Sequence, residues 1–506
     1  MGLVSFERLV SLLPRLALLL ICLELCIAGH AQTRDTAELV AADYLSGESI
    51  QKDLDSLKIW VESMHPAPFA RCSEQDWNEA YLEASELYNG GGTRLAAAQV
   101  FARLTNVMKD SHTCVSLKAL SDDLRELHGR LPFEITTIQN RIYIANDAVE
   151  TIEKGTEIRG VNDQSARMVL GMALQLVPLE GDAPIARLRL AEKFWNDLGP
   201  MMIQSTPIDS IIIQLTDSDE KNFEQAVAIN QSKSFLESRS DKSPINWEFI
   251  QRDGAEFAHL TITSFQSQHN RAFQRSLRRG FKRLNRLQDG DRKHRHGLIL
   301  DIRGNAGGNV ALMEMLLPYL TNSPVYLPHA VAIRQSAYTK SQYPRNQINW
   351  PIRKSSSLYE LTRFSKALRS TPIGVTEEIP FDIPSQPHKR LQYLGEVALL
   401  MDGLSASASV AFASWFIQSG RGETFGEPSM GSASGTFGNP VKRVLPHTGL
   451  TVNIATAQYF SSASHVWDSK PILPDHPISW KASDIQNGND PVFEAALQWL
   501  QNVQLQ

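Results

Sequence analysis

Cysteine is scarce in this chain of 506 residues, which contains four. Cys22 and Cys26 lie in an apolar run near the N-terminus, and neither follows the small residue that a lipid-modified cysteine requires. The other two, Cys72 and Cys114, could pair with each other in an exported protein. We expect Cys114 to be a packing residue rather than a nucleophile. A lipid anchor at these cysteines is not predicted.

The sequence also lacks a metal-ligand pattern, an internal repeat and a positive net charge. Because no His, Cys and carboxylate residues cluster at metal-ligand spacing, no metal and no organic cofactor are predicted. The formal net charge of −5 gives no general attraction for nucleic acid. In the one basic stretch, residues 271–295, arginines alternate with apolar residues at helical spacing. This pattern predicts an amphipathic helix with a solvated cationic face, and polyanion binding is the alternative.

The composition is typical of a globular protein, with 42% hydrophobic and 21% charged residues. The chain is long enough to form roughly three domains. The N-terminus reads as an export signal, because Arg8 and Arg15 precede a short apolar run that ends before Gly29-His30-Ala31. We therefore predict a signal peptide over residues 1–31 and a periplasmic or extracellular mature protein. The apolar run is too short and interrupted to predict a stable membrane anchor.

Small residues form the first of two informative motifs. The turn Ser405-Ala406-Ser407-Ala408-Ser409 separates an apolar run, Val397–Met401, from an apolar helical stretch, Phe412–Ile417. A serine between a buried strand and a helix can attack a carbonyl whose oxygen faces the N–H groups of the helix start. The pattern is typical of a serine-hydrolase nucleophile, although Ser/Ala strings also begin ordinary helices.

The second motif follows another apolar strand, Leu298–Ile302. Residues 303–309 read Arg-Gly-Asn-Ala-Gly-Gly-Asn, and a helix is expected from Val310. Glycines there permit positive φ and let backbone amides face a cleft. The spacing matches neither a dinucleotide loop nor a Walker loop, so phosphate binding is not expected.

Together the two motifs resemble those of the tail-specific, or C-terminal processing, peptidases and the related tricorn core peptidases. Asp301–Gly308 matches the family's strand and D-[LI]-R-x-N-x-G-G motif, and Ser405–Ser409 matches its serine turn. Further similar segments are His65–Phe69, Asp110–Thr113, Gly426–Ser429, Leu445–Leu450 and Pro474-Asp475, so the resemblance extends over most of the mature chain.

The resemblance implies that Ser407 is the nucleophile. In the Ser/Lys branch of the family, a lysine and a glutamate stand where this chain has Ser432 and Val410. A serine hydroxyl needs an adjacent base, and a histidine is the natural alternative near neutral pH. The tricorn-like branch carries a catalytic histidine directly after a serine, which implies that His112, after Ser111, is the base.

The same resemblance implies that Asp468 orients His112, with Asp475 and Asp110 as the competing acids. The oxyanion would be held by the backbone N–H of Ala408 and of Gly307 or Gly308. Accessory hydrogen bonds are expected from Ser111 and Ser432. A Ser/Lys dyad rebuilt from Lys442 or Lys470 is a further alternative.

The predicted fold class is α/β, with a ClpP/crotonase-like β-spiral protease core, an N-terminal helical domain and a PDZ-like module. The predicted function is an exported serine endopeptidase that acts through a Ser-His-Asp triad on peptides or unfolded proteins. The alternative is a noncatalytic peptide-binding relative of the same fold. The predicted domains are residues 35–127 (helical), 128–235 (PDZ-like), 243–485 (peptidase core, with an insertion at 322–388) and 486–506 (C-terminal helix).

Overall fold

The computed structural model describes the chain from residue 44 to residue 503, with internal gaps. The predicted signal peptide, residues 1–31, lies outside the described residues. No helix in the described part of the chain combines the length and apolarity needed to cross a bilayer. The described ranges are 44–147, 152–203, 209–229, 243–266, 270–290, 296–342, 370–381, 383–461 and 468–503.

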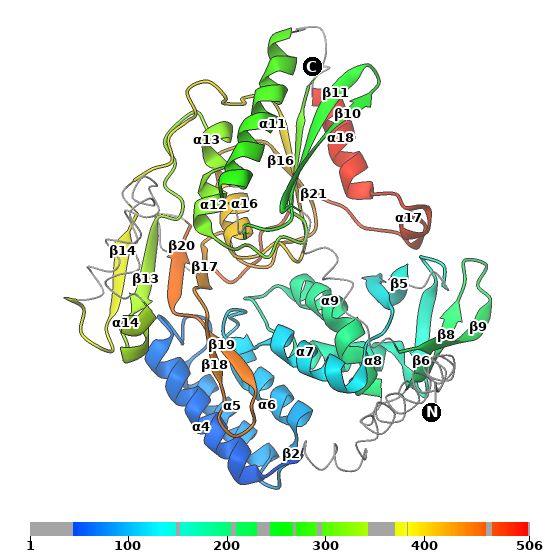
Figure 1. The fold of residues 1–506 in the computed structure, drawn as a ribbon, viewed down its shortest axis with the longest axis vertical. Coiled ribbons are helices and arrows are strands. Elements are labelled where there is room, and N and C mark those ends of the chain that lie inside the picture. Colours follow the sequence, from blue (N-terminus) through cyan, green and yellow to red (C-terminus); the bar gives the residue numbers. More distant parts are fainter. Residues whose placement is uncertain are drawn as a thin grey trace, which may run out of the picture.

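The N-terminal part is a group of helices, drawn in blue and cyan (Figure 1). Ser46, Ser73 and Thr93 cap three of them, each accepting a hydrogen bond from the backbone N–H three residues on. Such caps satisfy N–H groups that the first helical turn leaves free. The elements are β1 (Tyr44–Leu45), α4 (Gly47–Met64), α5 (Glu74–Leu87), β2 (Gly92–Thr93), α6 (Arg94–Asn106), β3 (Cys114–Val115) and α7 (Leu117–His128).

An antiparallel sheet with the strand order β4-β5-β6-β8-β9 follows, and β7 pairs with β6. Two helices accompany this sheet, and they pack against each other (Figure 1). The elements are β4 (Phe133–Ile138), β5 (Arg141–Asp147), β6 (Glu157–Val161), β7 (Gln164–Ser165), α8 (Ala166–Leu176), α9 (Pro184–Ile203), β8 (Ser210–Thr216) and β9 (Asn222–Ala228).

The core sheet has the strand order β10-β11-β12-β15-β16-β21. Its first two strands are antiparallel, and every later pair is parallel. The strands are β10 (Ile245–Arg252), β11 (Ala255–Ile262), β12 (Leu298–Asp301), β15 (Val397–Met401), β16 (Glu423–Gly426) and β21 (His476–Pro477). The helices around it are α11 (Asn270–Gly290), α12 (Val310–Glu314), α13 (Leu317–Leu320), α16 (Ala408–Gln418), α17 (Ala482–Asn487) and α18 (Pro491–Val503).

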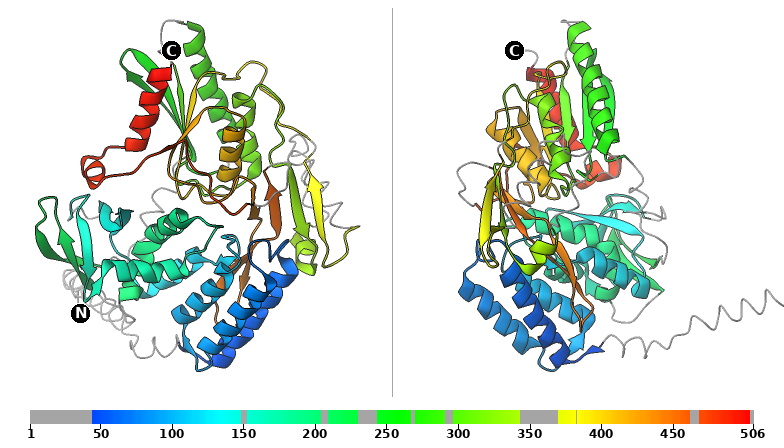
Figure 2. Two further views of the ribbon diagram at one scale, coloured as in Figure 1. Left: turned by 180° about the vertical axis from the view of Figure 1, so that it is seen from behind. Right: turned by 60° about the vertical axis from the view of Figure 1, so that its left-hand side comes forward.

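The strands of this core sheet are continuously apolar because helices cover both faces of the sheet. Because side chains alternate along a strand, Leu298 and Leu300 of β12 face the cluster with α11, α12 and α16. Ile299 between them packs in the cluster with α18 instead. The two layers of helices are visible on either side of the sheet (Figure 2).

Two smaller sheets join the core to the N-terminal helices. One has the order β14-β13-β20-β17, and the other has the order β18-β19-β3. In the second, Val452 of β19 pairs with Val115 of β3, so a strand from the core holds the segment that begins just after His112. The elements are β13 (Ala330–Arg334), α14 (Ala337–Gln342), β14 (Thr376–Pro380), β17 (Gly435–Gly438), β18 (Val441–Val444), β19 (Thr451–Ile454) and β20 (Ala457–Phe460).

The mixed α/β class predicted from the sequence is confirmed. Strands at 298–301 and 397–401, and helices at 310–314 and 408–418, stand where the two motifs predicted them. Residues 271–290 of the basic stretch lie in the helix α11, with Phe273, Leu277 and Phe281 buried. Cys72 and Cys114 are both free thiols, so the possible disulfide is not formed.

Candidate active site

Ser407 occupies the turn between β15 and α16, as the N-cap residue of the helix. Its backbone has φ +53° and ψ −119°, a conformation that a residue with a side chain rarely adopts. Such backbone strain persists only where the surrounding structure enforces it, and it clusters at functional sites. The turn therefore presents Ser407 in a conformation that an ordinary helix start does not require.

The structure separates the three serines of this turn. Ser405 donates its hydroxyl to the carbonyl of Ile302 at 2.9 Å, and is buried. Ser409 is completely buried, and its hydroxyl has no hydrogen-bond partner among the described residues. Ser407 is the one that lines a pocket. The geometry therefore favours Ser407 over its two neighbours as a nucleophile.

The glycine-rich segment after β12 lies against this turn. A Cβ on Gly307 would stand 2.7 Å from the Ala406 carbonyl oxygen and 2.8 Å from the Ala408 nitrogen, so only glycine permits this approach. Asn305 locks the two turns together. Its side chain donates to the Ile262 carbonyl at 2.9 Å, and its own carbonyl accepts from the Ala406 N–H at 3.0 Å. The importance of Asn305 was not predicted from the sequence.

The two predicted glycine donors differ. The Gly307 N–H donates to the Asn305 side-chain oxygen at 2.9 Å, so it is already used. The N–H groups of Gly308 and Ala408 donate to no other described residue, and both residues line the pocket with Ser407. Of the two glycines offered as oxyanion donors, the structure therefore favours Gly308, and Gly307 contributes close packing.

The pocket beside Ser407 has a volume of about 470 Å³. His112 lines it as well, although no hydrogen bond joins His112 and Ser407 within the described part of the chain. Catalytic hydrogen bonds are often long or absent before substrate binds, so shared lining of one pocket is the relevant observation. The other lining side chains are mostly apolar, among them Val310, Met313, Pro328, Phe381, Ala411 and Tyr459.

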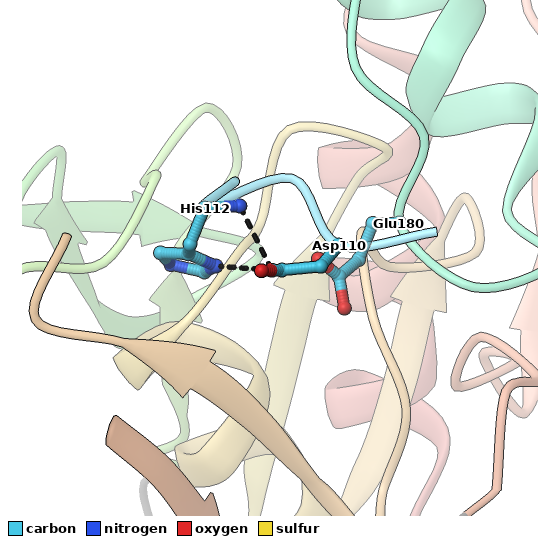
Figure 3. A group of neighbouring side chains, drawn as sticks. All are labelled: Asp110, His112 and Glu180. Carbon is cyan, nitrogen blue, oxygen red and sulfur yellow. Dashed lines mark hydrogen bonds and ion pairs between the residues drawn. The ribbon is translucent and has the colours of Figure 1, made fainter. Parts of the chain in front are cut away.

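The acid beside His112 is Asp110 (Figure 3). Its Oδ1 atom lies 3.5 Å from His112 Nδ1 and accepts the His112 backbone N–H at 2.9 Å. Burial acts to lower the pKa of His112, but the hydrogen bond and charge of Asp110, with the charge of Glu180, outweigh it and raise that pKa above 6.5. Because Nδ1 faces Asp110, Nε2 is the nitrogen left for a serine.

A buried ion pair frames this segment. Arg71 and Glu180 meet at 2.6 Å with both side chains essentially unexposed, and Arg71 also donates to the Lys109 carbonyl. Glu180 accepts from both the backbone N–H of Ser111, at 2.9 Å, and its hydroxyl, at 2.6 Å. Ser111 therefore fixes the loop that carries His112, rather than lining the pocket as predicted.

Asp110, His112 and Glu180 bring three potential metal ligands within 4.8 Å of one another (Figure 3). The three residues fit a metal ion poorly. The Arg71 guanidinium already forms an ion pair with one carboxylate oxygen of Glu180, and the Ser111 hydroxyl donates a hydrogen bond to the other. These carboxylates already have the partners that buried charges need. The cluster is a hydrogen-bonded framework in this structure.

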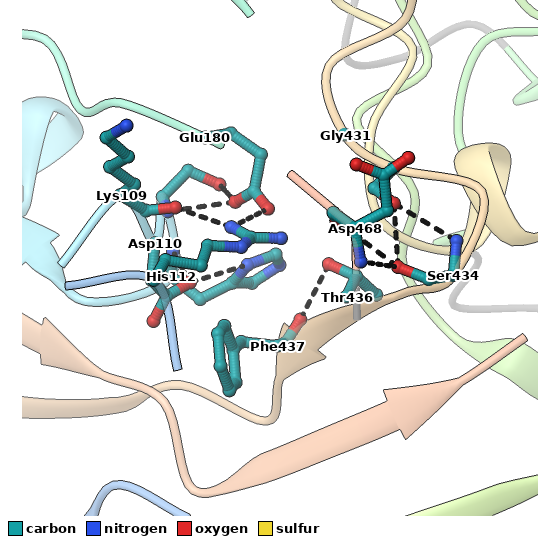
Figure 4. Close-up of polar contacts among 12 residues, drawn as sticks. Lys109, Asp110, His112, Glu180, Gly431, Ser434, Thr436, Phe437 and Asp468 are labelled. Carbon is teal, nitrogen blue, oxygen red and sulfur yellow. Dashed lines mark hydrogen bonds and ion pairs between the residues drawn. The ribbon is translucent and has the colours of Figure 1, made fainter. Parts of the chain in front are cut away.

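The predicted acid, Asp468, does not contact His112. Its side chain is exposed and accepts from the Lys470 N–H at 3.0 Å, and its carboxylate points away from the His112 ring (Figure 4). The prediction that Asp468 orients His112 therefore differs from the structure, in which Asp110 holds that place. Asp475 bonds both the backbone and the hydroxyl of Thr424 instead.

The remaining predicted groups also lie away from the pocket lining. Ser432 is fully buried and shares a hydrogen bond of 2.7 Å with the Ser434 hydroxyl. The exposed Lys442 and Lys470, offered as bases of a Ser/Lys dyad, are not among the residues that line the pocket with Ser407. The structure therefore brings together Ser407, His112, Ala408 and Gly308, and leaves the other predicted site residues outside.

A larger pocket, of about 710 Å³, lies at a different place on the core. Its lining includes Arg189 and Arg303, and each arginine is paired with two carboxylates. This pocket contains neither Ser407 nor His112, so we place the chemistry in the smaller pocket.

Comparison with solved structures identifies proteins that share this fold. Mature CPAF shares the fold, with a TM-score of 0.64, 15% identity and coverage of 90% of this chain and 96% of that chain. A structure of mature CPAF complexed with lactacystin has a TM-score of 0.63, 15% identity and coverage of 90% and 97%. The photosystem II D1 C-terminal processing protease has a TM-score of 0.40, 13% identity and coverage of 85% and 93%, and a likeness at that score carries no structural argument. No curated protein matches the sequence significantly.

Residues 256–478 match the model of peptidase family S41. The family match and the shared fold place this chain among the serine-type peptidases. This match confirms the resemblance predicted from the sequence. A peptidase acts on peptide or protein substrates, so the pocket beside Ser407 is the candidate active site.

Proposed function

We propose that this chain is an exported serine endopeptidase of the tail-specific type, with Ser407 as nucleophile and His112 as general base. One observation carries the proposal. Ser407, in a strained turn, and His112, beside a buried carboxylate, line one pocket although they are far apart in the sequence. We propose further that the core is of the ClpP/crotonase-like type and that the sheet of residues 133–228 is the PDZ-like module.

In this mechanism Ser407 Oγ attacks the peptide carbonyl and His112 Nε2 accepts its proton. The carbonyl oxygen, now negative, accepts hydrogen bonds from the N–H groups of Ala408 and Gly308. Asp110 stabilises the imidazolium and fixes the proton on Nδ1. His112 then returns the proton to the leaving amine, and water releases the acyl group by the same steps. We propose Asp110 as the acid in place of Asp468.

The surroundings of the pocket suit an extended peptide. Strand β17 forms the edge of its sheet, and Thr436 and Gly438 from that strand line the pocket. The edge of a sheet can bind a peptide as an added strand, through main-chain hydrogen bonds. The apolar lining around Val310, Met313 and Phe381 would accept an apolar side chain of the substrate.

A fluorophosphonate probe tests the nucleophile, because it forms a covalent bond with an activated serine. We expect stoichiometric labelling of the mature chain and none in Ser407→Ala. Ser409→Ala is the matched control: it removes a buried hydroxyl from the same turn, and should leave labelling intact. Labelling that persists in Ser407→Ala would contradict the proposal. No labelling of the wild type would favour a noncatalytic peptide-binding protein.

A further inference from the structure

A second histidine lies behind the candidate triad. His65 is the C-cap residue of α4, and its backbone N–H donates to the Val61 carbonyl at 2.9 Å. Its side chain is buried, and its ring packs against Phe437 at 4.5 Å between centroids. The mechanism described above does not use this residue. A buried imidazole needs partners for both ring nitrogens, so its contacts define its state.

Those contacts determine where the proton of His65 lies. The Ala67 backbone N–H donates to His65 Nδ1 at 3.1 Å, so Nδ1 must carry a lone pair. The ring proton is therefore on Nε2, which lies 3.1 Å from Asp110 Oδ2. His65 is thus a neutral donor to Asp110.

Asp110 uses its two oxygens for different histidines. Oδ2 accepts from His65, while Oδ1 faces His112. Burial acts to raise the pKa of Asp110, but the hydrogen bonds from the two histidines outweigh it and hold that pKa below its usual range. Asp110 is therefore an ionised carboxylate held at both ends.

The other charged groups facing His112 are Glu180, which raises its pKa, and Arg71, which lowers it. The Arg71 guanidinium lies over the Phe437 ring, 5.5 Å from its centroid. The same ring packs against His65. Phe437 is therefore a shared neighbour of His65 and Arg71, and the His65 ring has polar contacts with Ala67 and Asp110.

We propose that His65 is a positioning residue for the peptidase reaction: by donating its Nε2 proton to Asp110, it holds that carboxylate in the orientation that aligns His112 with Ser407. The inference rests on the proposed function, because it assigns a role behind the same nucleophile and base. Without this donor, the Asp110 carboxylate is free to rotate away from His112 Nδ1. Loss of a hydrogen bond that orients a functional side chain from behind typically lowers activity by about 10- to 100-fold.

The test compares three variants of the full mature chain in the cleavage of an unfolded protein or peptide. His65→Leu removes the donor, and His65→Gln supplies an N–H at a similar reach. His128→Leu is the matched control, because His128 is also buried and bonds to neither Asp110 nor His112. Variants are compared at equal folded concentration.

We expect His65→Leu to lower kcat by about 10- to 100-fold with little change in KM, because the loss is in alignment rather than in binding. With Asp110 displaced, the raised pKa of His112 falls, so the acid limb of the kcat/KM profile moves to lower pH. His65→Gln should restore most of the wild-type kcat and return the acid limb of the kcat/KM profile close to its wild-type pH. Wild-type kcat and an unmoved limb in His65→Leu would overturn the inference.

Nuclear magnetic resonance of ¹⁵N-histidine in the wild-type chain tests the same inference if His65→Leu does not fold. We expect the His65 signals, assigned by their loss in His65→Gln, to show the neutral ring with its proton on Nε2 at neutral pH. A proton on Nδ1, or a charged ring, would overturn the inference. Activity that survives Ser407→Ala or His112→Ala would instead contradict the proposed function. Loss in both with normal His65→Leu would contradict the role of His65 alone.

Discussion

At the scale of single residues, the family resemblance implied Ser407 and His112, which line one pocket. It did not imply the acid that lies beside His112. The acid depends on which way a side chain points, and sequence does not give that direction. Asp468 stands where the resemblance placed it, yet its carboxylate bonds the Lys470 N–H. Asp110 was one of the two competing acids, and its buried carboxylate lies 3.5 Å from His112 Nδ1.

Isosteric substitutions distinguish the two acids. Asp110→Asn keeps the shape but removes the charge that stabilises the imidazolium, so we expect a loss of about 10⁴-fold in kcat. Asp468→Asn should change kcat less than about 10-fold, because its exposed side chain does not contact His112. Steady-state peptide cleavage measures both. A severe loss in Asp468→Asn, with a mild one in Asp110→Asn, would restore the original assignment.

At the scale of elements, the site depends on two strand-to-helix turns held against each other. The β12–α12 and β15–α16 connections were predicted separately. Asn305 joins them, and no sequence pattern gave it that role, because its partners Ile262 and Ala406 are 43 and 101 positions away. Parallel pairing of β12 with β15 brings the two turns to one edge of the sheet.

Asn305→Ala should therefore damage both stability and rate. The Ile262 carbonyl and the Gly307 N–H would lose their partner in a buried place, which costs about 1–3 kcal/mol for each unsatisfied group. The matched control is Asn246→Ala, which removes only an exposed hydrogen bond of 3.0 Å to the Glu248 side chain. Thermal unfolding and peptide cleavage check the contrast. Equal effects of the two changes would refute the role given to Asn305.

At the scale of the whole molecule, the site exists only where the N-terminal helices meet the core. Strand β3 pairs with β19, and Arg71, Glu180 and Ser111 lock the intervening loop. The sequence could predict the α/β core, because its strands are apolar runs bounded by glycine. It could not predict the Arg71–Glu180 pair, because those residues are separated by 109 positions and neither belongs to a motif.

Glu180→Ala tests this locking contact. The change removes the carboxylate that pairs with the buried Arg71, and breaking such a pair typically costs about 3–5 kcal/mol. Glu83→Ala breaks the exposed pair with Arg103, and should change stability by less than about 1 kcal/mol. Denaturant unfolding measures both. A Glu180→Ala chain as stable as Glu83→Ala would show that the buried pair does not hold the two parts together.

The raised pKa of His112 sets the pH dependence of the enzyme. A general base must be neutral, and the pKa of His112 lies above its ordinary value of 6.5 because of Asp110. Activity should therefore fall as the pH drops through a value above 6.5. In Asp110→Asn, the midpoint of the remaining activity should move to lower pH. The pH profile of kcat/KM checks this, and an acid midpoint below 6.5 in the wild type would contradict it.

The most direct test of the central claim is the rate of fluorophosphonate labelling as a function of pH, with the labelled residue identified by peptide mass spectrometry. The account predicts that the label is on Ser407, that the rate falls below a midpoint above 6.5, and that His112→Ala lowers the rate by at least about 100-fold. Label on another serine, or an undiminished rate in His112→Ala, would contradict the claim that His112 activates Ser407.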